Sequence, residues 1–318
     1  MKTYNINKSL KESLDREVNA FELDPQIFLH DPIKIQEERK EFVLNNPFPI
    51  PDTIGVQDIF IPSSKDDYSI RLHIYQSKQY NPNHVLLYFH GGGYVFGLPE
   101  QVDEQMFYLA DKLDATIVSV DYKLSPQYTY PAALNDGLDA LKWLIEKGEE
   151  LLGINPINIT LYGGSAGGHL AGLVSQIAAI EDYKQIKHQF LLYPVINFRL
   201  DSNSMSDQPD ALLWNKTYAE ISKQHFLGKE PIKENPGIAD LDQYKEIHLL
   251  PKTTLVACEF DPLRDEAINY AMKLYKAEVP TELWVVPGAV HIFDLFESDL
   301  KEQFYSFLLN RLKSGFNQ

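Results

Sequence analysis

Residues 157–168 read INITLYGGSAGG, and this stretch decides the fold. An apolar run of strand type leads into a glycine-rich turn around Ser165, and a helix-forming stretch up to residue 180 follows. A strand, a sharp turn and a helix hold a serine hydroxyl clear of a sheet, and Gly163 and Gly167 are small because the turn is crowded. The start of a helix also favours negative charge beside the serine. We therefore expect Ser165 to be a nucleophile. The alternative is a phosphate-binding glycine turn, but no lysine follows it as in a P-loop.

On both sides of this turn, strand and helix signals alternate along the chain. Alternation of this kind predicts a parallel sheet with helices on both faces, which is an α/β fold. The predicted strands cover residues 55–61, 68–75, 85–89, 116–120, 157–162, 189–193, 253–258 and 282–286. The predicted helices of this part of the chain cover residues 132–147, 166–180, 263–277 and 299–313.

Two segments fall outside this alternation. Residues 1–50 carry two helical patterns, at 9–23 and 32–44, and residues 198–250 hold no buried-strand signal but a helical stretch from Ala211 to Phe226. An insertion after the carboxyl end of a strand lies over the catalytic edge of such a sheet. We expect residues 1–50 and 198–250 to form a cap, and residues 51–197 and 251–318 to form the core. A plain long connection is the alternative for the second segment.

A second glycine run, His90-Gly91-Gly92-Gly93-Tyr94, follows the predicted strand 85–89. Backbone N–H groups aimed at the oxygen of a tetrahedral intermediate lower the barrier to acyl transfer, and glycines let the backbone approach closely. We assign the N–H groups of Gly92 and Gly93 to an oxyanion hole, together with Ala166, which follows the serine. The alternative is a flexible hairpin tip. We expect His90 to brace the loop.

The partners of the serine should follow it in the order acid, then histidine. Among nine histidines, only His291 lies after the last unit that could carry the acid, so we expect it to be the general base. Asp261 is the first carboxylate of the loop beyond strand 253–258, and we expect it to orient the imidazole. An N-cap role is an alternative for Asp261, and Glu259 is the main rival as the acid. We expect Asp265 and Glu266 to be first-turn charges of the following helix.

These motifs together resemble the hormone-sensitive-lipase family of carboxylesterases, in its bacterial branch. The resemblance runs from about residue 50 to the end and rests on the motifs HGGGY (90–94), DYKLSP (121–126) with YPAALND (130–136), GGSAGG (163–168), DPLRDE (261–266) and His291. It implies the α/β-hydrolase fold, with an eight-stranded, mostly parallel sheet and a helical cap. It implies a triad of Ser165, Asp261 and His291, hydrolysis of short acyl esters without a cofactor or metal, and a homodimer as one possible state.

Several residues depart from the family pattern. The family usually has an acidic residue or Thr in place of Gly164 and Asn in place of His169. It usually has Arg-Leu-Ala-Pro-Glu where this chain has Lys-Leu-Ser-Pro-Gln at residues 123–127, so that Gln127 replaces a glutamate. None of them belongs to the expected triad or oxyanion hole, so they bear on substrate preference. We expect the substrate pocket to be shaped by Tyr94, Gly164, Trp214 and Phe226; packing of such apolar residues on the core is the alternative.

The composition excludes several partners. The formal net charge of −16 over 318 residues disfavours nucleic acid and anionic membrane surfaces. No window approaches the roughly 18 apolar residues of a membrane span, so no stable membrane association is expected. The single cysteine, Cys258, cannot form an internal disulfide, and the first residues contain no apolar signal-peptide core, so we expect a cytoplasmic protein.

The sequence thus predicts a serine carboxylesterase with a small-molecule ester as its substrate. Two other functions use the same fold. One is a non-catalytic ligand-binding protein, which the presence of His291 disfavours. The other is an amidase or peptidase with the same triad, which a matched ester and anilide would distinguish.

Overall fold

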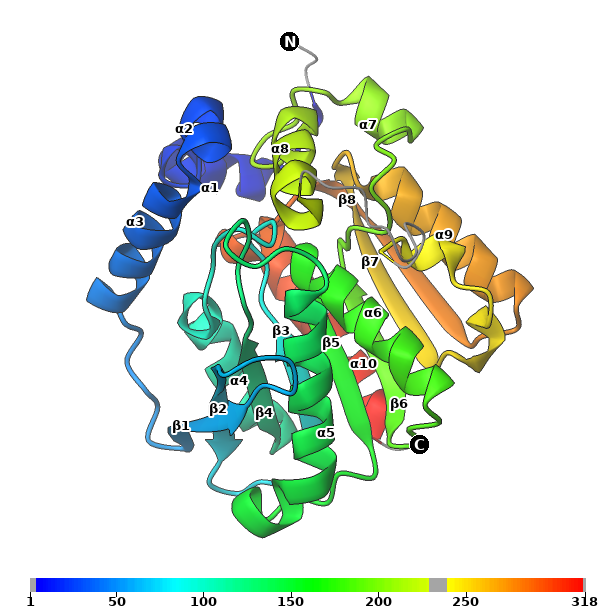
Figure 1. Cartoon of the computed structure of the whole chain (residues 1–318). Helices are drawn as coiled ribbons and strands as arrows, with labels where there is room; N and C mark the ends of the chain where they lie inside the picture. The colour runs from blue at the N-terminus through cyan, green and yellow to red at the C-terminus, as the bar shows by residue number, and fades with distance from the viewer. Residues whose placement is uncertain (1–3, 229–238, 317–318) are drawn as a thin grey trace.

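In the computed structural model, which describes residues 4–228 and 239–316, an eight-stranded sheet forms the centre of the molecule (Figure 1). The strand order is β1-β2-β4-β3-β5-β6-β7-β8. β2 pairs antiparallel with β1 and β4, and the other neighbouring pairs are parallel. The strands are β1 (Ile54–Pro62), β2 (Ser69–Ser77), β3 (Val85–Phe89), β4 (Thr116–Asp121), β5 (Ile159–Gly164), β6 (Ile186–Leu192), β7 (Lys252–Phe260) and β8 (Thr281–Val290).

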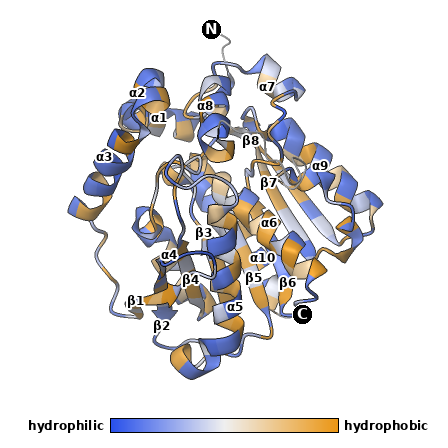
Figure 2. Ribbon diagram, in the orientation of Figure 1, coloured by the Kyte–Doolittle hydropathy of each residue, from blue (hydrophilic) through white to orange (hydrophobic). Residues whose placement is uncertain are grey.

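Helices cover both faces of this sheet, so the predicted fold class is confirmed. One apolar cluster packs α5, α6 and α9 on one face, and a second cluster packs α4 and α10 on the other. In Figure 2, hydrophobic segments concentrate around the strands and α6, whereas α3 is hydrophilic over most of its length. The α-helices are α1 (Lys8–Glu17), α2 (Pro25–His30), α3 (Pro32–Asn45), α4 (Asp103–Leu113), α5 (Ala132–Leu152), α6 (Ala166–Ile180), α7 (Asn203–Asp207), α8 (Lys216–Leu227), α9 (Arg264–Lys276) and α10 (Asp299–Phe316). Short 3₁₀ turns are η1 (Val18–Ala20), η2 (Pro99–Val102), η3 (Leu241–Gln243), η4 (Ile247–Leu249) and η5 (Phe293–Leu295).

The parallel strands bring distant parts of the sequence to one edge of the sheet. Gly164 pairs with Leu192, Leu192 pairs with Val256, and Phe260 pairs with Val290, so β5, β6, β7 and β8 end side by side. Ligands of open α/β sheets bind outside the carboxyl ends of the strands. This edge is therefore the place where a site is expected.

Several elements of the structure differ from the prediction. β8 continues to Val290, four residues beyond its predicted end, and α4 was not predicted. The predicted helix 9–23 ends at Glu17 and gives way to η1, because Asp24 accepts from the Gln26 N–H at 2.7 Å and starts a new helix. The helix expected from Ala211 begins only at Lys216, because the Asn215 side chain caps it by accepting from the Tyr218 N–H at 3.1 Å.

The N-terminal helices contact the second segment that falls outside the alternation. α2 packs against α8, and Figure 1 shows α1 and α2 beside α8 at one end of the molecule, with α3 extending away from α8. The Tyr218 hydroxyl donates to the Leu23 carbonyl at 2.6 Å, and His225 Nε2 donates to the Phe28 carbonyl at 2.8 Å. We propose that residues 1–50 and 198–250 are two parts of one cap over the core segments 51–197 and 251–318. Residues 229–238 of this proposed cap lie outside the described residues.

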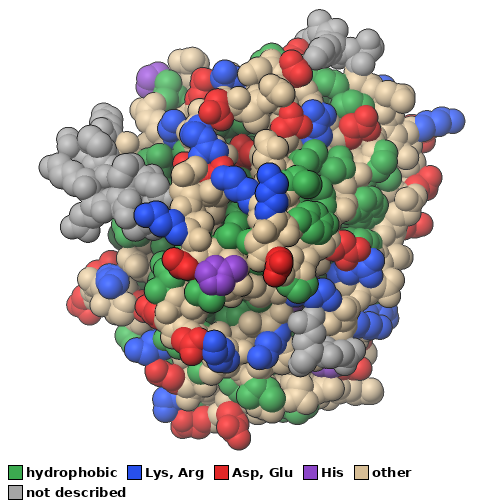
Figure 3. Space-filling view, turned by 90° about the vertical axis from the view of Figure 1, so that its right-hand side faces the viewer, with side chains coloured by type: hydrophobic (Ala, Val, Ile, Leu, Met, Phe, Trp, Pro, Cys, Tyr) green, Lys and Arg blue, Asp and Glu red, His purple; other side chains and the backbone are tan. Residues whose placement is uncertain are grey.

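Acidic and basic side chains are interspersed on the face shown in Figure 3. Within residues 4–228 and 239–316, no helix is long and apolar enough to cross a membrane. The same residues include no group of three or more His, Cys, Asp or Glu side chains placed to hold a metal ion.

Candidate active site

Ser165 occupies the turn between β5 and α6. Its backbone φ of +56° lies in the left-handed region, which residues other than glycine rarely adopt. Crowding explains the small residues on either side. A Cβ on Gly163 would lie 2.3 Å from the Gly167 carbonyl oxygen, and a Cβ on Gly167 would lie 2.0 Å from the Phe89 carbonyl oxygen. The sequence therefore folds into a strained turn that presents the serine at the end of the sheet.

Asp261 directly follows β7 and His291 directly follows β8, so both side chains lie at the edge of the sheet where Ser165 lies. His291 Nε2 lies 2.9 Å from Ser165 Oγ, and His291 Nδ1 lies 2.6 Å from Asp261 Oδ2. All three side chains are buried. With Nδ1 protonated toward the carboxylate, Nε2 is left to accept the serine proton. The structure thus brings together the three residues that the sequence predicts.

The second oxygen of Asp261 has a structural partner. Asp261 Oδ1 accepts from the Leu263 N–H at 2.9 Å, and α9 begins only at Arg264. Asp261 therefore holds the turn before the helix and is not its N-cap residue. This bond fixes the carboxylate while its other oxygen faces the imidazole.

Glu259, the rival acid, contacts the backbone before His291 instead of the imidazole. Its Oε2 accepts from the Gly288 N–H at 2.7 Å. The sequence predicted that this strand ends at residue 286 and that His291 lies in the loop after it. Because β8 extends to Val290, His291 instead follows the strand directly. The pairing of β7 with β8 shifts register between Cys258 and Phe260, which lets both strands run on to the site.

The glycine loop lies beside the serine. A Cβ added to Gly91 would lie 3.6 Å from Ser165 Cβ. Gly92 and Gly93 have φ values of +127° and +58°. In the described part of the chain, no group accepts a hydrogen bond from the N–H of Gly92 or Gly93. These two donors are available to a ligand. Their conformations also explain why glycine is needed at both positions.

The contacts of the glycine loop hold it in place. His90 Nδ1 donates to the Gly91 carbonyl at 2.8 Å, and its ring stacks on Tyr122 at 4.2 Å. The Tyr122 hydroxyl donates to the His90 carbonyl at 2.7 Å. From α8, the Ser222 hydroxyl donates to the Gly93 carbonyl at 2.6 Å. His90 thus contacts the loop backbone as a brace would.

A cavity of about 520 Å³ opens onto Ser165 and His291. Two of the four expected pocket residues, Gly164 and Trp214, line it. Tyr94 and Phe226 do not, which corrects the prediction. Their rings stack on each other at 3.9 Å and are almost completely buried, so they form the support behind the glycine loop.

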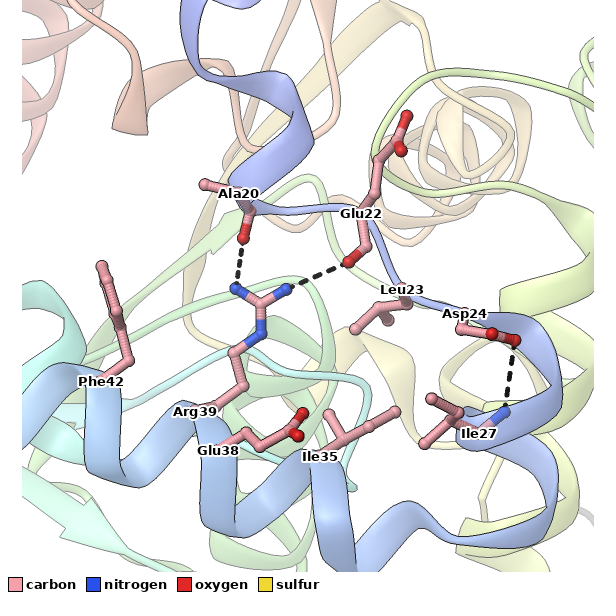
Figure 4. Close-up of a pocket in the computed structure, with 9 residues that line it drawn as sticks. All are labelled: Ala20, Glu22, Leu23, Asp24, Ile27, Ile35, Glu38, Arg39 and Phe42. Atoms are coloured by element: carbon pink, nitrogen blue, oxygen red, sulfur yellow. Dashed lines mark hydrogen bonds between the residues drawn. The ribbon is translucent and has the colours of Figure 1, made fainter.

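The N-terminal helices supply the outer wall of the cavity. Arg39 of α3 donates to the carbonyl groups of Ala20 at 2.7 Å and Glu22 at 3.4 Å (Figure 4). Leu23, Arg39 and Phe42 line both the catalytic cavity and a neighbouring surface pocket of about 280 Å³. Arg39 therefore connects residues 20–22, at the end of η1, to α3, in the wall that the catalytic cavity shares with the surface pocket.

The chain is similar to several known esterases. A sequence profile of the α/β-hydrolase fold matches residues 86–295. The chain is 31% identical over 244 residues to an ethyl acetate hydrolase of Pseudomonas putida, which covers 76% of each chain. It is 31% identical over 229 residues to an arylesterase of Saccharolobus solfataricus, covering 72% of this chain and 74% of that protein. The solved structure of a bacterial heroin esterase superposes with a TM-score of 0.86 at 28% identity, covering 96% of this chain and 98% of that one.

The chain belongs to the hormone-sensitive-lipase family of α/β hydrolases. The hydrolase is a carboxylic ester hydrolase. The fold predicted from the motifs and the family predicted from the resemblance are both confirmed.

The hydrolase buries His169, one of the residues at which the sequence departs from the family pattern. His169 Nε2 donates to the Ala239 carbonyl at 2.6 Å, so Nδ1 is left to accept from the Tyr94 hydroxyl at 2.9 Å. Burial lowers the pKa of His169 to about 4, and the ring is neutral at pH 7. His169 thus joins the helix behind the serine to the residue that follows Gly93.

Glu266 lies in the first turn of α9, as the sequence predicted, but it does not face solvent. It is buried, and its Oε1 accepts from the Ile196 N–H at 2.8 Å. Burial raises the pKa of Glu266 to about 8. Its helix position was predictable, but the loop after β6 that covers it comes from a distant part of the chain. No local signal could have indicated that burial.

Proposed function

We propose that this hydrolase is a serine carboxylesterase that cleaves short-chain acyl esters with Ser165, His291 and Asp261 as its triad. The observation that carries the proposal is the pair of hydrogen bonds, 2.6 Å and 2.9 Å long, that join the three side chains beside the cavity. A nucleophile and base within this reach, with the base oriented by a third group, favour nucleophilic catalysis.

In the proposed first step, Ser165 Oγ attacks the ester carbonyl while His291 Nε2 takes its proton. The carbonyl oxygen becomes negative and accepts from the N–H groups of Gly92, Gly93 and Ala166. Each such donor typically contributes about 3–4 kcal/mol of transition-state stabilisation. His291 then gives the proton to the leaving alcohol, and the acyl group remains on Ser165. Asp261 stabilises the imidazolium that exists between the two transfers.

The second step repeats this sequence with water. His291 removes a proton from the water as it attacks the acyl-enzyme, and the same N–H groups hold the negative oxygen. The proton then returns to Ser165 Oγ, and the carboxylic acid leaves. No cofactor is needed, because acid–base transfer and electrostatic stabilisation by these residues complete the cycle.

The cavity and the relatives support a small ester as the substrate. At about 520 Å³ the cavity is of the size that holds small organic ligands. Phe21, Leu213 and Trp214 give it apolar wall area. The related Pseudomonas putida protein is named for the hydrolysis of ethyl acetate, an ester with a two-carbon acyl group. We infer a preference for short acyl chains in this hydrolase.

Replacement of the nucleophile tests the triad. Ser165→Ala should lower kcat for p-nitrophenyl acetate by about 10⁴–10⁶. A fluorophosphonate probe should label the wild type and not the variant. Retention of most of the activity by the variant would contradict the assignment. Activity that stays level from the acetate to the dodecanoate ester would contradict the short-chain preference.

The alternatives predict different outcomes. An amidase with the same triad would hydrolyse an anilide about as well as the matched ester, whereas we expect the ester to react much faster. A non-catalytic binding protein would hydrolyse neither. The position of His291 at hydrogen-bonding distance from Ser165 favours catalysis.

We also propose that the hydrolase is cytoplasmic and that it forms a homodimer. The buried, free thiol of Cys258 fits a reducing compartment, and the family resemblance suggests the dimer. Cell fractionation tests the first proposal, and light scattering coupled to gel filtration tests the second.

A further inference from the structure

Polar groups form one part of the wall of the substrate cavity, close to the triad. Tyr88, Gln105, Tyr193 and Asp294 all line the cavity that opens onto Ser165. The Tyr193 ring lies 4.7 Å from the His291 ring, and the Tyr193 hydroxyl donates to Asp294 Oδ1 at 2.7 Å. Tyr193 thus connects Asp294 on this polar wall to His291, the proposed general base.

Asp294 retains hydrogen-bonding capacity on this wall. Only 2% of its surface is exposed, and burial raises the pKa of its carboxyl group. Its Oδ2 accepts from Gln105 Nε2 at 3.4 Å, which is long for a hydrogen bond. A carboxylate has about four acceptor positions. Asp294 is therefore a buried acid with room for another donor.

The Tyr88 hydroxyl provides an independent observation. Tyr88 is 3% exposed, and no group within residues 4–228 and 239–316 forms a hydrogen bond with its hydroxyl. Burial, followed by the charge of Asp294, raises the pKa of this hydroxyl, so the two groups lie within electrostatic reach. Because Tyr88 lines the cavity, its hydroxyl is available to a ligand or to water as a hydrogen-bonding partner.

Among residues 4–228 and 239–316, two cationic side chains line the cavity, and both already have partners. Arg39 donates to the carbonyl groups of Ala20 and Glu22, and Lys301 pairs with Glu297 and, at 3.4 Å, with Glu104. An anionic ligand group would therefore face Asp294 with no free positive charge beside it. An ammonium group would suit Asp294 only when the acid is ionised. A hydroxyl group suits either protonation state of the acid, because it donates and accepts.

We propose that Tyr88, Gln105 and Asp294 form a hydroxyl-binding subsite, and that the favoured substrates of the hydrolase are esters that carry a hydroxyl group. The bound hydroxyl donates to Asp294 and accepts from Tyr88. An ester without the hydroxyl leaves the Tyr88 hydroxyl without a partner and an acceptor position of Asp294 unfilled, and sites built to bind a hydroxyl discriminate strongly against such analogues. The proposal rests on the proposed esterase function and specifies its substrate class.

The hydroxyl can lie on either part of the ester, and two pairs of substrates distinguish these sources. For the acyl part, p-nitrophenyl 3-hydroxybutyrate is compared with p-nitrophenyl butyrate. For the alcohol part, 2-hydroxyethyl butyrate is compared with propyl butyrate. In the wild type, the ratio of kcat/KM for the hydroxylated to the plain ester should reach about tenfold in one pair. A ratio of one or less in both pairs would overturn the proposal.

Two substitutions assign the preference to the subsite. Tyr88→Phe removes one oxygen and should lower that ratio about fivefold. Asp294→Leu should lower it about tenfold. If Asp294→Leu fails to fold, Gln105→Leu replaces it, because this variant leaves the bond between Asp294 and Tyr193 intact. Gln105→Leu should lower the ratio about threefold. A purely structural role would lower kcat/KM for both esters equally, and an unchanged ratio in these variants would overturn the proposal.

Two control variants lie outside the cavity lining. Tyr108→Phe removes a hydroxyl from α4, and Glu297→Gln removes a charge near Lys301; both should leave the ratio unchanged. A fall of the ratio in either control equal to that of Tyr88→Phe would contradict the subsite. Failure of the esterase function has a different result, because the plain esters would then not be hydrolysed or Ser165→Ala would remain active.

Discussion

His169 Nδ1 accepts a hydrogen bond from the Tyr94 hydroxyl at 2.9 Å, and this bond joins the nucleophile helix to the glycine loop. Tyr94 directly follows Gly93 and has a φ of +64°. Its hydroxyl is therefore one of the attachments of a strained segment, together with the bond from Ser222 to the Gly93 carbonyl.

We expect His169→Phe to destabilise the protein by about 2–4 kcal/mol, because the Tyr94 hydroxyl and the Ala239 carbonyl would both lose a buried partner. Urea unfolding measures the loss. Tyr94→Phe is the matched second variant, and the double variant should lose less than the sum of the two. Strict additivity would show that the two side chains are not energetically coupled.

The same histidine should make the fold sensitive to acid. Its folded pKa of about 4 lies below the ordinary value of 6.5, so the unfolded chain binds the proton more readily. The resulting stability is complete above pH 6.5 and is lost as the pH falls toward 4. His169→Phe lacks this titration, so its stability deficit relative to the wild type should shrink over that window. Unfolding free energies measured at several pH values test this, and a constant deficit would contradict it.

Glu266 should act in the opposite direction. Its folded pKa of about 8 lies above the ordinary value of 4.5, so the folded protein holds the proton more tightly. Stability from this group is complete below pH 4.5 and is lost as the pH rises toward 8, by at most about 1.4 kcal/mol per pH unit. Glu266→Gln should show a flatter dependence on pH across this range. Equal slopes for the wild type and the variant would show that Glu266 is ionised in the fold.

The two glycines before Ser165 should differ in their tolerance of alanine. A Cβ on Gly163 would lie 2.3 Å from a backbone oxygen, whereas a Cβ on Gly164 would lie 3.4 Å from the Tyr193 ring, which is an ordinary contact. We expect Gly163→Ala to abolish soluble, active protein and Gly164→Ala to fold and retain activity. Gly164→Ala should change kcat/KM between substrates, because Gly164 lines the cavity. Equal losses in both variants would contradict the steric explanation.

The roles of the two acids near His291 can be separated by amide substitutions. Asp261→Asn should lower kcat by about 10⁴, because the amide favours the wrong imidazole tautomer. Glu259→Gln removes a similar charge but leaves an oxygen that can accept from the Gly288 N–H, so kcat should change by less than about tenfold. A larger loss in Glu259→Gln than in Asp261→Asn would reverse the assignment of the acid.

The sequence by itself determined the fold and predicted the three residues of the proposed triad. Three signals can be read along the chain: the alternation of strands and helices, the small residues around Ser165, and the order of Asp261 and His291. They are enough to predict the site because parallel strands bring their carboxyl ends to one edge of the sheet. The sequence also identified Gly92 and Gly93, since positive φ values are a backbone requirement that glycine satisfies.

Only the tertiary structure decided what surrounds these residues. The stacking of Tyr94 on Phe226 removes both from the cavity, and the burial of Glu266 changes its pKa; each depends on contacts between segments far apart in the chain. The unpaired Tyr88 hydroxyl and the carboxyl of Asp294 likewise come from β3 and from the turn after β8. Burial and electrostatic proximity are properties of packed neighbours, and no local pattern of residues records which neighbours those will be.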